Sequence, residues 1–193
     1  MKKLLLMAAV MLSSVGAFAQ HAVGSFTLQP KVGINITNTT NYSDVAKARV
    51  DFAGGLEGEY QVSDIFSLSA GLMYSRQGYK AKDIANVAGY KLAGSDWKPS
   101  YLNIPVLANV YVVPGLAVKL GVQPGFMVDK DDASDVNTFD LSIPVGLSYE
   151  YNNFVLDGRY NWGVTKINKH SVEGFDDTRN SVFQITLGYK FSL

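Results

Sequence analysis

Residues 183–193 alternate between apolar and polar side chains without a break. The apolar face carries Phe183, Ile185, Leu187, Tyr189, Phe191 and Leu193, and the polar face carries Gln184, Thr186, Gly188, Lys190 and Ser192. Successive side chains of a strand point to opposite faces, so the pattern predicts a strand with one apolar and one polar side. Because soluble domains usually let their last residues fray, we expect this strand to close a barrel.

The same alternation recurs in seven earlier stretches. They cover residues 26–36, 50–60, 66–74, 101–112, 116–128, 139–151 and 154–164. With the terminal run they predict eight strands, the smallest usual even number for transmembrane barrels. Pro105, Pro124 and Pro144 fall inside these strands, where proline removes a ladder hydrogen bond. We expect local bulges and broken pairing near these three residues.

The connections between the predicted strands alternate in length. Tight turns rich in Pro, Gly, Asn, Asp and Ser cover residues 61–64, 113–115 and 151–153. Longer polar segments cover residues 37–49, 80–98, 129–138 and 166–179. Short turns on one side and long loops on the other are typical of outer-membrane barrels, whose short side faces the periplasm. An even strand count then places both termini on the periplasmic side.

Aromatic residues gather near both ends of the predicted strands. Tyr60, Phe66, Tyr149, Tyr151, Phe154, Tyr189 and Phe191 lie near the short turns, and Phe52, Tyr74, Phe139 and Trp162 lie nearer the long loops. Two such rings match the aromatic belts at the two surfaces of a bilayer. The alternative is that aromatic residues are simply common in any sheet.

The N-terminus has the features of a secretory signal peptide. Lys2 and Lys3 precede an apolar stretch at 4–15, and Ala17-Phe18-Ala19 forms a small-residue cleavage site. The apolar stretch is shorter than the ~20 residues of a membrane-spanning helix. We therefore predict a signal peptide at 1–19, cleaved after Ala19, and a barrel domain at 20–193.

Composition favours a membrane barrel over a soluble domain. Hydrophobic residues make up 47% of the chain and charged residues 18%, whereas globular proteins average about 25% charged residues. After the signal peptide no apolar run approaches the length of a membrane helix. The fold class predicted is therefore all-β: a closed antiparallel up-and-down transmembrane β-barrel of eight strands, with short periplasmic turns and longer extracellular loops.

Two further totals exclude specific classes. There is no cysteine, which excludes disulfides, cysteine metal sites and lipid attachment through an N-terminal cysteine. The formal net charge is +0, so electrostatics give no reason to expect a nucleic-acid partner.

Six segments resemble the porin-like (PorT-type) outer-membrane β-barrel family of Gram-negative bacteria. They are Pro30–Asn35, Gly54–Tyr60, Leu72–Tyr79, Tyr101–Val106, Arg159–Gly163 and Leu187–Phe191. The resemblance covers essentially the whole mature chain and implies a small eight-stranded barrel in the cell outer membrane. It also implies that a proline is tolerated at Pro105, but it supplies no mechanism. One departure is the ending in Ser192-Leu193 rather than on an aromatic residue.

If the apolar face meets lipid, the polar face lines the lumen. The charged residues predicted there are Lys31, Asp51, Glu57, Glu59, Lys119, Asp140, Glu150, Asp157, Arg159 and Lys190. An eight-stranded barrel is just wide enough for side chains to fill it, and opposite charges packed there would neutralise one another. Asp157 and Arg159, two apart on one face, are the first pair expected. A plugged polar core is the main interpretation, and a narrow conduit for small solutes is the alternative.

Catalytic, metal and cofactor sites are not expected. His170, Ser171 and Glu173 resemble a hydrolase set, but they share one predicted loop instead of converging from separate positions on a rigid frame. The acidic segment 129–135 could hold a hard cation, yet it lacks the spacing of a dedicated calcium loop. The glycines are scattered through the strands and form no phosphate-binding motif.

We therefore expect a non-enzymatic integral outer-membrane protein with a mostly plugged lumen and surface loops available for interaction or adhesion. A narrow porin-like channel is the alternative function. A soluble barrel that binds an apolar ligand, like a lipocalin, is a third hypothesis. The expected partners are outer-membrane lipid, the barrel assembly machinery through the C-terminal strand, and an unknown surface ligand. We expect a monomer.

Overall fold

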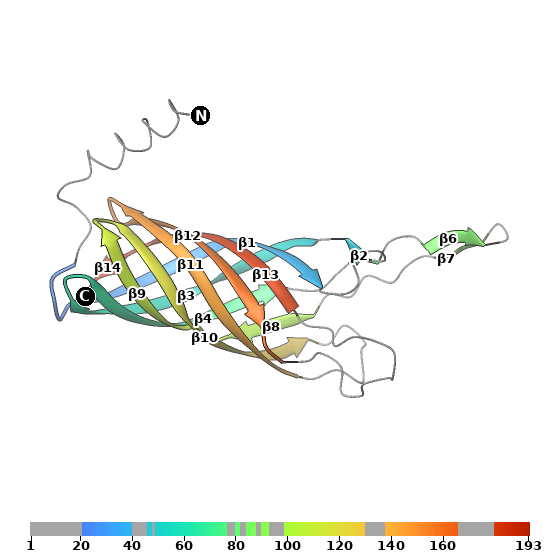
Figure 1. The fold of residues 1–193 in the computed structure, drawn as a ribbon, viewed down its shortest axis with the longest axis horizontal. Coiled ribbons are helices and arrows are strands. Elements are labelled where there is room, and N and C mark those ends of the chain that lie inside the picture. The colour runs from blue at the N-terminus through green and yellow to red at the C-terminus, as the bar shows by residue number, and fades with distance from the viewer. Residues whose placement is uncertain are drawn as a thin grey trace, which may run out of the picture.

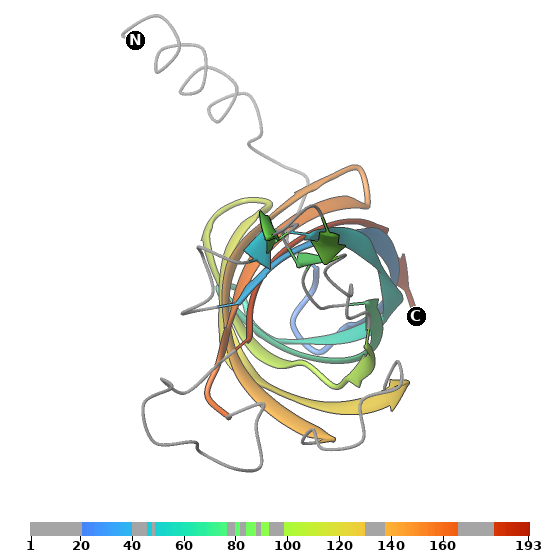
Figure 2. The same ribbon diagram turned by 90° about the vertical axis from the view of Figure 1, so that its right-hand side faces the viewer.

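A computed structural model describes residues 21–39, 46–47, 49–76, 80–81, 84–87, 90–92, 99–129, 138–165 and 180–193. These residues form a closed antiparallel β-barrel of eight strands (Figures 1 and 2). In chain order the barrel strands are β1 (Phe26–Thr39), β3 (Arg49–Ser63), β4 (Phe66–Arg76), β8 (Ser100–Asn103) continued by β9 (Val106–Val113), β10 (Leu116–Asp129), β11 (Phe139–Tyr151), β12 (Phe154–Gly163), and β13 (Asn180–Tyr189) continued by β14 (Phe191–Ser192). The predicted fold class and strand count are confirmed.

Two short two-stranded sheets stand beyond the long-loop end of the barrel (Figure 1). One joins β2 (Ala46–Lys47) to β5 (Lys80–Ala81), and the other joins β6 (Ile84–Val87) to β7 (Tyr90–Leu92). The alternation of apolar and polar residues did not predict them, because strands this short carry no readable period.

Each barrel strand pairs with its neighbour in the chain, and the last strand returns to the first. β1 pairs with β13 from Lys31↔Gly188 to Thr39↔Asn180, and with β14 at Thr27↔Ser192 and Leu28↔Phe191. This pairing of β1 with β13 and β14 leaves the barrel without an open edge, which a sheet in lipid requires.

Pro105, Pro124 and Pro144 interrupt pairing but do not shift it. Ile104 and Pro105 separate β8 from β9, and Pro124 lies opposite that gap in β10. The β10–β11 ladder skips the pairs at Pro144 and Ile143 and resumes at Gln123↔Ser142. The same register holds on both sides of each gap. The broken pairing expected from the sequence is present, whereas the expected bulges are wrong.

The two faces of the barrel wall differ in polarity as the alternation predicts. One outward apolar residue from each barrel strand, each 45–58% exposed, illustrates this: Val32, Phe52, Leu72, Val106, Leu120, Val145, Leu156 and Leu187. Inward polar residues, each 6% exposed or less, include Lys31, Glu57, Ser69, Asn109, Lys119, Ser148, Asp157 and Thr186. An apolar exterior around a polar interior is the inverse of a soluble lipid-binding barrel and suits a bilayer.

The tight turns lie together at one end of the barrel, beside the C-terminus (Figure 1). Gly115 has a positive φ of 79°, and Asn152 and Asn153 have positive φ values of 47° and 69°. Glycine and asparagine adopt this left-handed conformation more easily than other residues, so they fit two-residue hairpin turns. This end corresponds to the periplasmic side of outer-membrane barrels.

Within the described residues, no helix is long and apolar enough to cross a membrane. The predicted signal peptide at 1–19 lies outside the described residues, so its cleavage stays a prediction.

Candidate functional site

Charged side chains converge in the lumen because of how the strands are ordered around the barrel. β10 lies directly across from β1, four strands away in either direction, and β12 is two strands from each of them. The inward positions of these strands carry Lys119, Lys31, and the pair Asp157 and Arg159. Long side chains from opposite walls can therefore meet in the middle.

Five residues form a central cluster, namely Lys31, Glu57, Lys119, Asp157 and Arg159. The Arg159 guanidinium donates from Nε to Asp157 Oδ1 and from Nη2 to Asp157 Oδ2, both at 2.7 Å. The same Nη2 donates to Glu57 Oε2 at 2.6 Å. The expected Asp157–Arg159 pair is therefore in contact, and a carboxylate from β3 joins it.

The two lysines of the central cluster also share its carboxylates. Lys31 Nζ donates to Glu57 Oε2 at 2.8 Å and lies 3.8 Å from Asp157 Oδ2. Lys119 Nζ lies 3.2 Å from Glu57 Oε1 and 3.0 Å from Asp157 Oδ2. Glu57 thus contacts three cations from three different strands, and Asp157 contacts the same three.

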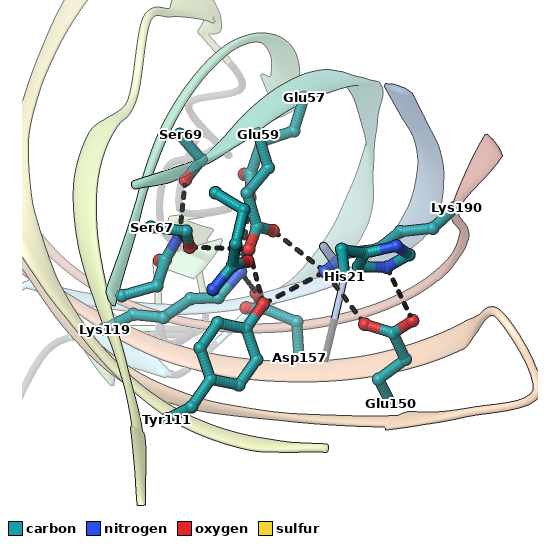
Figure 3. Close-up of polar contacts among 12 residues, drawn as sticks. His21, Glu57, Glu59, Ser67, Ser69, Tyr111, Lys119, Glu150, Asp157 and Lys190 are labelled. Carbon is teal, nitrogen blue, oxygen red and sulfur yellow. Dashed lines mark hydrogen bonds and ion pairs between the residues drawn. The ribbon is translucent and has the colours of Figure 1, made fainter. Parts of the chain in front are cut away.

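A second group, the basal cluster, lies towards the turn end and is centred on Lys190 (Figure 3). Lys190 Nζ lies 2.9 Å from Glu59 Oε2, 2.8 Å from Glu150 Oε2 and 3.2 Å from the Tyr111 hydroxyl. Tyr111 in turn donates its hydroxyl proton to Glu59. These four residues come from β13–β14, β3, β11 and β9, which are every second strand around the barrel.

Further polar groups extend the basal cluster (Figure 3). Ser67 Oγ donates to Glu59 Oε1 at 2.6 Å, and Asn109 Nδ2 donates to Ser67 Oγ at 3.0 Å and to Ser69 Oγ at 3.2 Å. His21 Nε2, from the segment before β1, lies 3.1 Å from Glu150 Oε1. The sequence did not predict any of these as site residues, although Ser67, Ser69 and Asn109 occupy inward polar positions of predicted strands.

Charge is balanced among the buried residues that the structure describes. Four cations face four anions: Lys31, Lys119, Arg159 and Lys190 against Glu57, Glu59, Glu150 and Asp157. The central cluster has one cation more than its carboxylates, and the basal cluster has one carboxylate more than its lysine. Buried charges are costly unless they are paired, and each charge of the two clusters has at least one partner of opposite charge.

The remaining two predicted lumen residues lie at the long-loop rim, outside both clusters. Asp51 pairs with Arg49, whose Nη2 donates to Asp51 Oδ1 at 2.9 Å. Asp140 Oδ1 accepts a hydrogen bond from Thr165 Oγ1 at 2.5 Å. Both carboxylates are half-buried, so they border the lumen and do not cross it.

Between the central cluster and this rim the described polar contacts are neutral. Gln184 Nε2 donates to Asn35 Oδ1 at 2.9 Å, and Asn35 Nδ2 donates to Ser75 Oγ at 2.6 Å. These contacts join β13, β1 and β4 across the inside of the wall. The sequence reasoning did not select these residues, because amides and hydroxyls are common at any inward position.

Glycine makes room for the central cluster. Gly146 lies between Lys119 and Arg159 across three neighbouring strands. A Cβ added at Gly146 would lie 2.5 Å from the Gly158 carbonyl oxygen and 2.9 Å from Arg159 Cγ. Only a residue without a side chain therefore lets both cations enter the lumen from adjacent positions.

The described residues contain no group of three or more His, Cys, Asp or Glu that could hold a metal ion. The acidic segment 129–135 lies outside the described residues except for Asp129, and His170, Ser171 and Glu173 lie outside them altogether. The ion pairs in the lumen link opposite walls of the barrel and occupy the space through which a solute would have to pass.

Comparisons with known proteins agree with this architecture. The sequence model of a family described as the outer membrane protein beta-barrel domain matches residues 18–169. Among curated proteins, none matches the sequence.

Two solved structures share the fold at low sequence identity. The Ail protein of Yersinia pestis, the attachment invasion locus protein, was solved with the heparin analogue sucrose octasulfate; it is 14% identical with a TM-score of 0.51, over 88% of this chain and 99% of that one. Neisserial surface protein A is 18% identical with a TM-score of 0.52, over 86% of this chain and 97% of that one. At these identities the likeness concerns the fold alone.

Proposed function

The chain belongs to the outer membrane protein beta-barrel domain family, and from this premise we propose a non-enzymatic scaffold whose lumen is closed by ion pairs and whose long loops carry surface interaction or adhesion. The protein resides in the outer membrane, as its family and its apolar outer wall indicate. Within that family we assign it to the porin-like PorT-type group, on the six sequence segments that resemble it.

The proposal of a closed lumen rests on one observation: Lys119 contacts Asp157 and Glu57 across the barrel. An ion or solute could pass only if these pairs separated in a space that offers few other partners. Separating a buried ion pair leaves uncompensated charges and costs several kcal/mol. A conducting state would therefore be rare in the wild-type protein.

Planar-bilayer conductance tests the closed lumen. We expect the purified wild-type protein to give no steady openings. The double variant Glu57→Ala with Arg159→Ala removes one anion and one cation together, so it creates space without a net change of charge, and openings should appear. The matched control Arg49→Ala with Asp51→Ala makes the same change at the rim and should stay silent. Steady wild-type openings would favour the narrow channel instead.

The proposed surface interaction is supported by the lengths of the loops and by a solved structure of similar fold. The ends of the barrel strands that flank the long connections at 40–48, 77–98, 130–137 and 166–179 all lie at the same end of the barrel. Ail is named for attachment, and its structure holds a heparin analogue. Cells that display the protein should bind immobilised heparin or host-cell matrix more than empty cells do. Replacing residues 77–98 with Asn-Gly, which keeps the hairpin, should reduce that binding if this loop contributes.

We propose a monomer that meets the barrel assembly machinery through its C-terminal strand. The complete ring of eight strands supports the monomer, because closure needs no second chain. The regular apolar face of 183–193 supports the role in assembly. Truncation after Lys190 should slow folding in cells more than folding from urea into vesicles, where no machinery acts.

A further inference from the structure

The segment before β1 folds back at the turn end of the barrel (Figure 1). A tight turn is closed there by a hydrogen bond of 2.9 Å from Ser25 N to the Ala22 carbonyl oxygen, with Gly24 at a positive φ of 87°. Gly24 N also donates to the Gln61 carbonyl oxygen at 2.8 Å, and Gln61 N donates to the Ser25 carbonyl oxygen at 3.0 Å. The segment 21–25, called the N-terminal strap below, is thus fixed to the end of β3.

The other end of the N-terminal strap contacts the opposite wall. His21 Nε2 lies 3.1 Å from Glu150 Oε1, and because an ionised carboxylate only accepts hydrogen bonds, the imidazole is the donor (Figure 3). The two side chains are 16% and 5% exposed. Glu150 belongs to β11, which is four strands away from β3 in either direction around the barrel. The strap therefore crosses the mouth of the lumen from one wall to the wall that faces it.

The contact between His21 and Glu150 is what fastens the strap to this far wall. The next three residues, Ala22–Gly24, have no polar side-chain atoms, and Val23 is 55% exposed. The buried Ser25 hydroxyl has no hydrogen-bond partner within the described part of the chain. Little apolar surface therefore holds the strap in place, and loss of one side-chain contact is enough to free its far end.

Glu150 is suited to receive the strap because it is shared between two donors. Among the described residues, Lys190 Nζ donates to Glu150 Oε2 at 2.8 Å, and His21 donates to Oε1. Each carboxylate oxygen thus has one donor. Leaving a buried acceptor without a donor is costly, so removal of His21 favours the entry of water to Glu150 and to the basal cluster around it.

We propose that the N-terminal strap is a releasable lid over the periplasmic mouth of the lumen, held shut by the contact between His21 and Glu150. With the strap in place, water-soluble molecules of the periplasm do not reach the basal cluster. With the strap released, they enter as far as the central cluster. The lid deepens the proposed closed lumen, on which it rests, by adding a second closure at the turn end. Its tests measure mobility and access and not conductance, so either proposal can fail alone.

Spin labelling tests how the strap is held, with the protein refolded into phospholipid vesicles. The chain has no cysteine, so Val23→Cys supplies a single attachment site at an exposed position. The label should be restrained in this otherwise wild-type protein, and His21→Ala should raise its mobile fraction by about threefold or more, as local release requires. The matched control is Asn152→Gly, which removes a polar side chain from a hairpin turn at the same end and should leave the label restrained.

Thiol accessibility tests the closure itself, in detergent micelles that leave both ends of the barrel open to reagent. Ser69→Cys places a thiol beside the basal cluster, where the serine is 3% exposed. Ser142→Cys places one on the long-loop side of the central cluster. With a small charged methanethiosulfonate, His21→Ala should speed the labelling of Ser69→Cys by about tenfold or more and leave that of Ser142→Cys unchanged.

Gly24→Val releases the strap by a second route and should reproduce both effects. Valine rarely adopts the positive φ of this turn, and nothing lies within 4 Å of an added Cβ, so the variant strains the turn without a clash. The gel-mobility shift between folded and heat-unfolded protein verifies that each variant is folded. A label that is equally restrained with and without His21 would overturn the proposal. So would slow labelling of Ser69→Cys in a variant whose strap is mobile.

Discussion

Arg159 and Glu57 are 102 residues apart in the sequence, yet the guanidinium Nη2 lies 2.6 Å from the carboxylate Oε2 inside the barrel. Glu57 also accepts a hydrogen bond from Lys31 and pairs with Lys119. One carboxylate thus offsets three cations that reach it from three strands. We therefore expect the loss of different buried charges to lower the stability of the barrel by different amounts.

Glu57→Gln should strongly destabilise the barrel. It leaves Lys31, Lys119 and Arg159 with Asp157 alone, and an uncompensated buried charge costs about 3–5 kcal/mol. Urea titration of the protein in phospholipid vesicles measures this free energy of unfolding.

Lys31→Met is the matched comparison for Glu57→Gln. It removes the surplus cation of the central cluster and leaves two cations with two carboxylates. It should therefore cost less than half as much as Glu57→Gln. Equal losses for the two variants would show that charge balance in the cluster does not govern stability.

Gly146→Ala should destabilise the barrel by about 1–3 kcal/mol, the usual cost of overpacking. The new Cβ would lie 2.5 Å from a backbone oxygen, which cannot rotate away, and 2.9 Å from Arg159 Cγ. Gly158→Ala, on the outward face with nothing within 4 Å of the new Cβ, is the control and should change little. The gel-mobility shift between folded and heat-unfolded protein reports both variants, and a harmless Gly146→Ala would refute the crowding.

Tyr111→Phe should cost about 1.5–3 kcal/mol, the range for hydrogen bonds to charged groups. The Tyr111 hydroxyl donates to Glu59 and accepts from Lys190 at 3.2 Å, so its loss leaves both buried charges with one partner fewer. Tyr60→Phe makes the same chemical change on the outer wall, where the side chain is 48% exposed. If both variants unfold at the same urea concentration, the basal cluster contributes nothing to stability.

Trp162 should report the lipid-facing wall. Its side chain is 60% exposed and points outward near the long-loop end of β12. With Trp97→Phe as background, Trp162 is the single remaining tryptophan, and brominated phospholipids should quench its fluorescence strongly. Quenching by aqueous iodide, with no effect of bromolipid, would mean that this face meets water.

The sequence by itself determined the eight barrel strands and their two faces. A period of two is a local property of the backbone, so a run such as 139–151 predicts the same residues as β11. The closeness of Asp157 and Arg159 was also local, since residues two apart on a strand share a face. For Pro105, Pro124 and Pro144 the sequence predicts the missing N–H, which is a local property. Whether the ladder responds with a bulge or with a gap in the pairing depends on the partner strand, so that part was not predictable.

The tertiary structure alone decided which charges meet. Closure and strand tilt set Lys119 across from Lys31, and Lys190 among Glu59, Glu150 and Tyr111. The same closure placed β3 and β11 on facing walls, so that the N-terminal strap spans the mouth between Gln61 and Glu150. The alternation of residues along a strand says which side of the wall a residue faces, but not its height or its opposite neighbour. Those depend on the register of all eight strands together, which no single segment encodes.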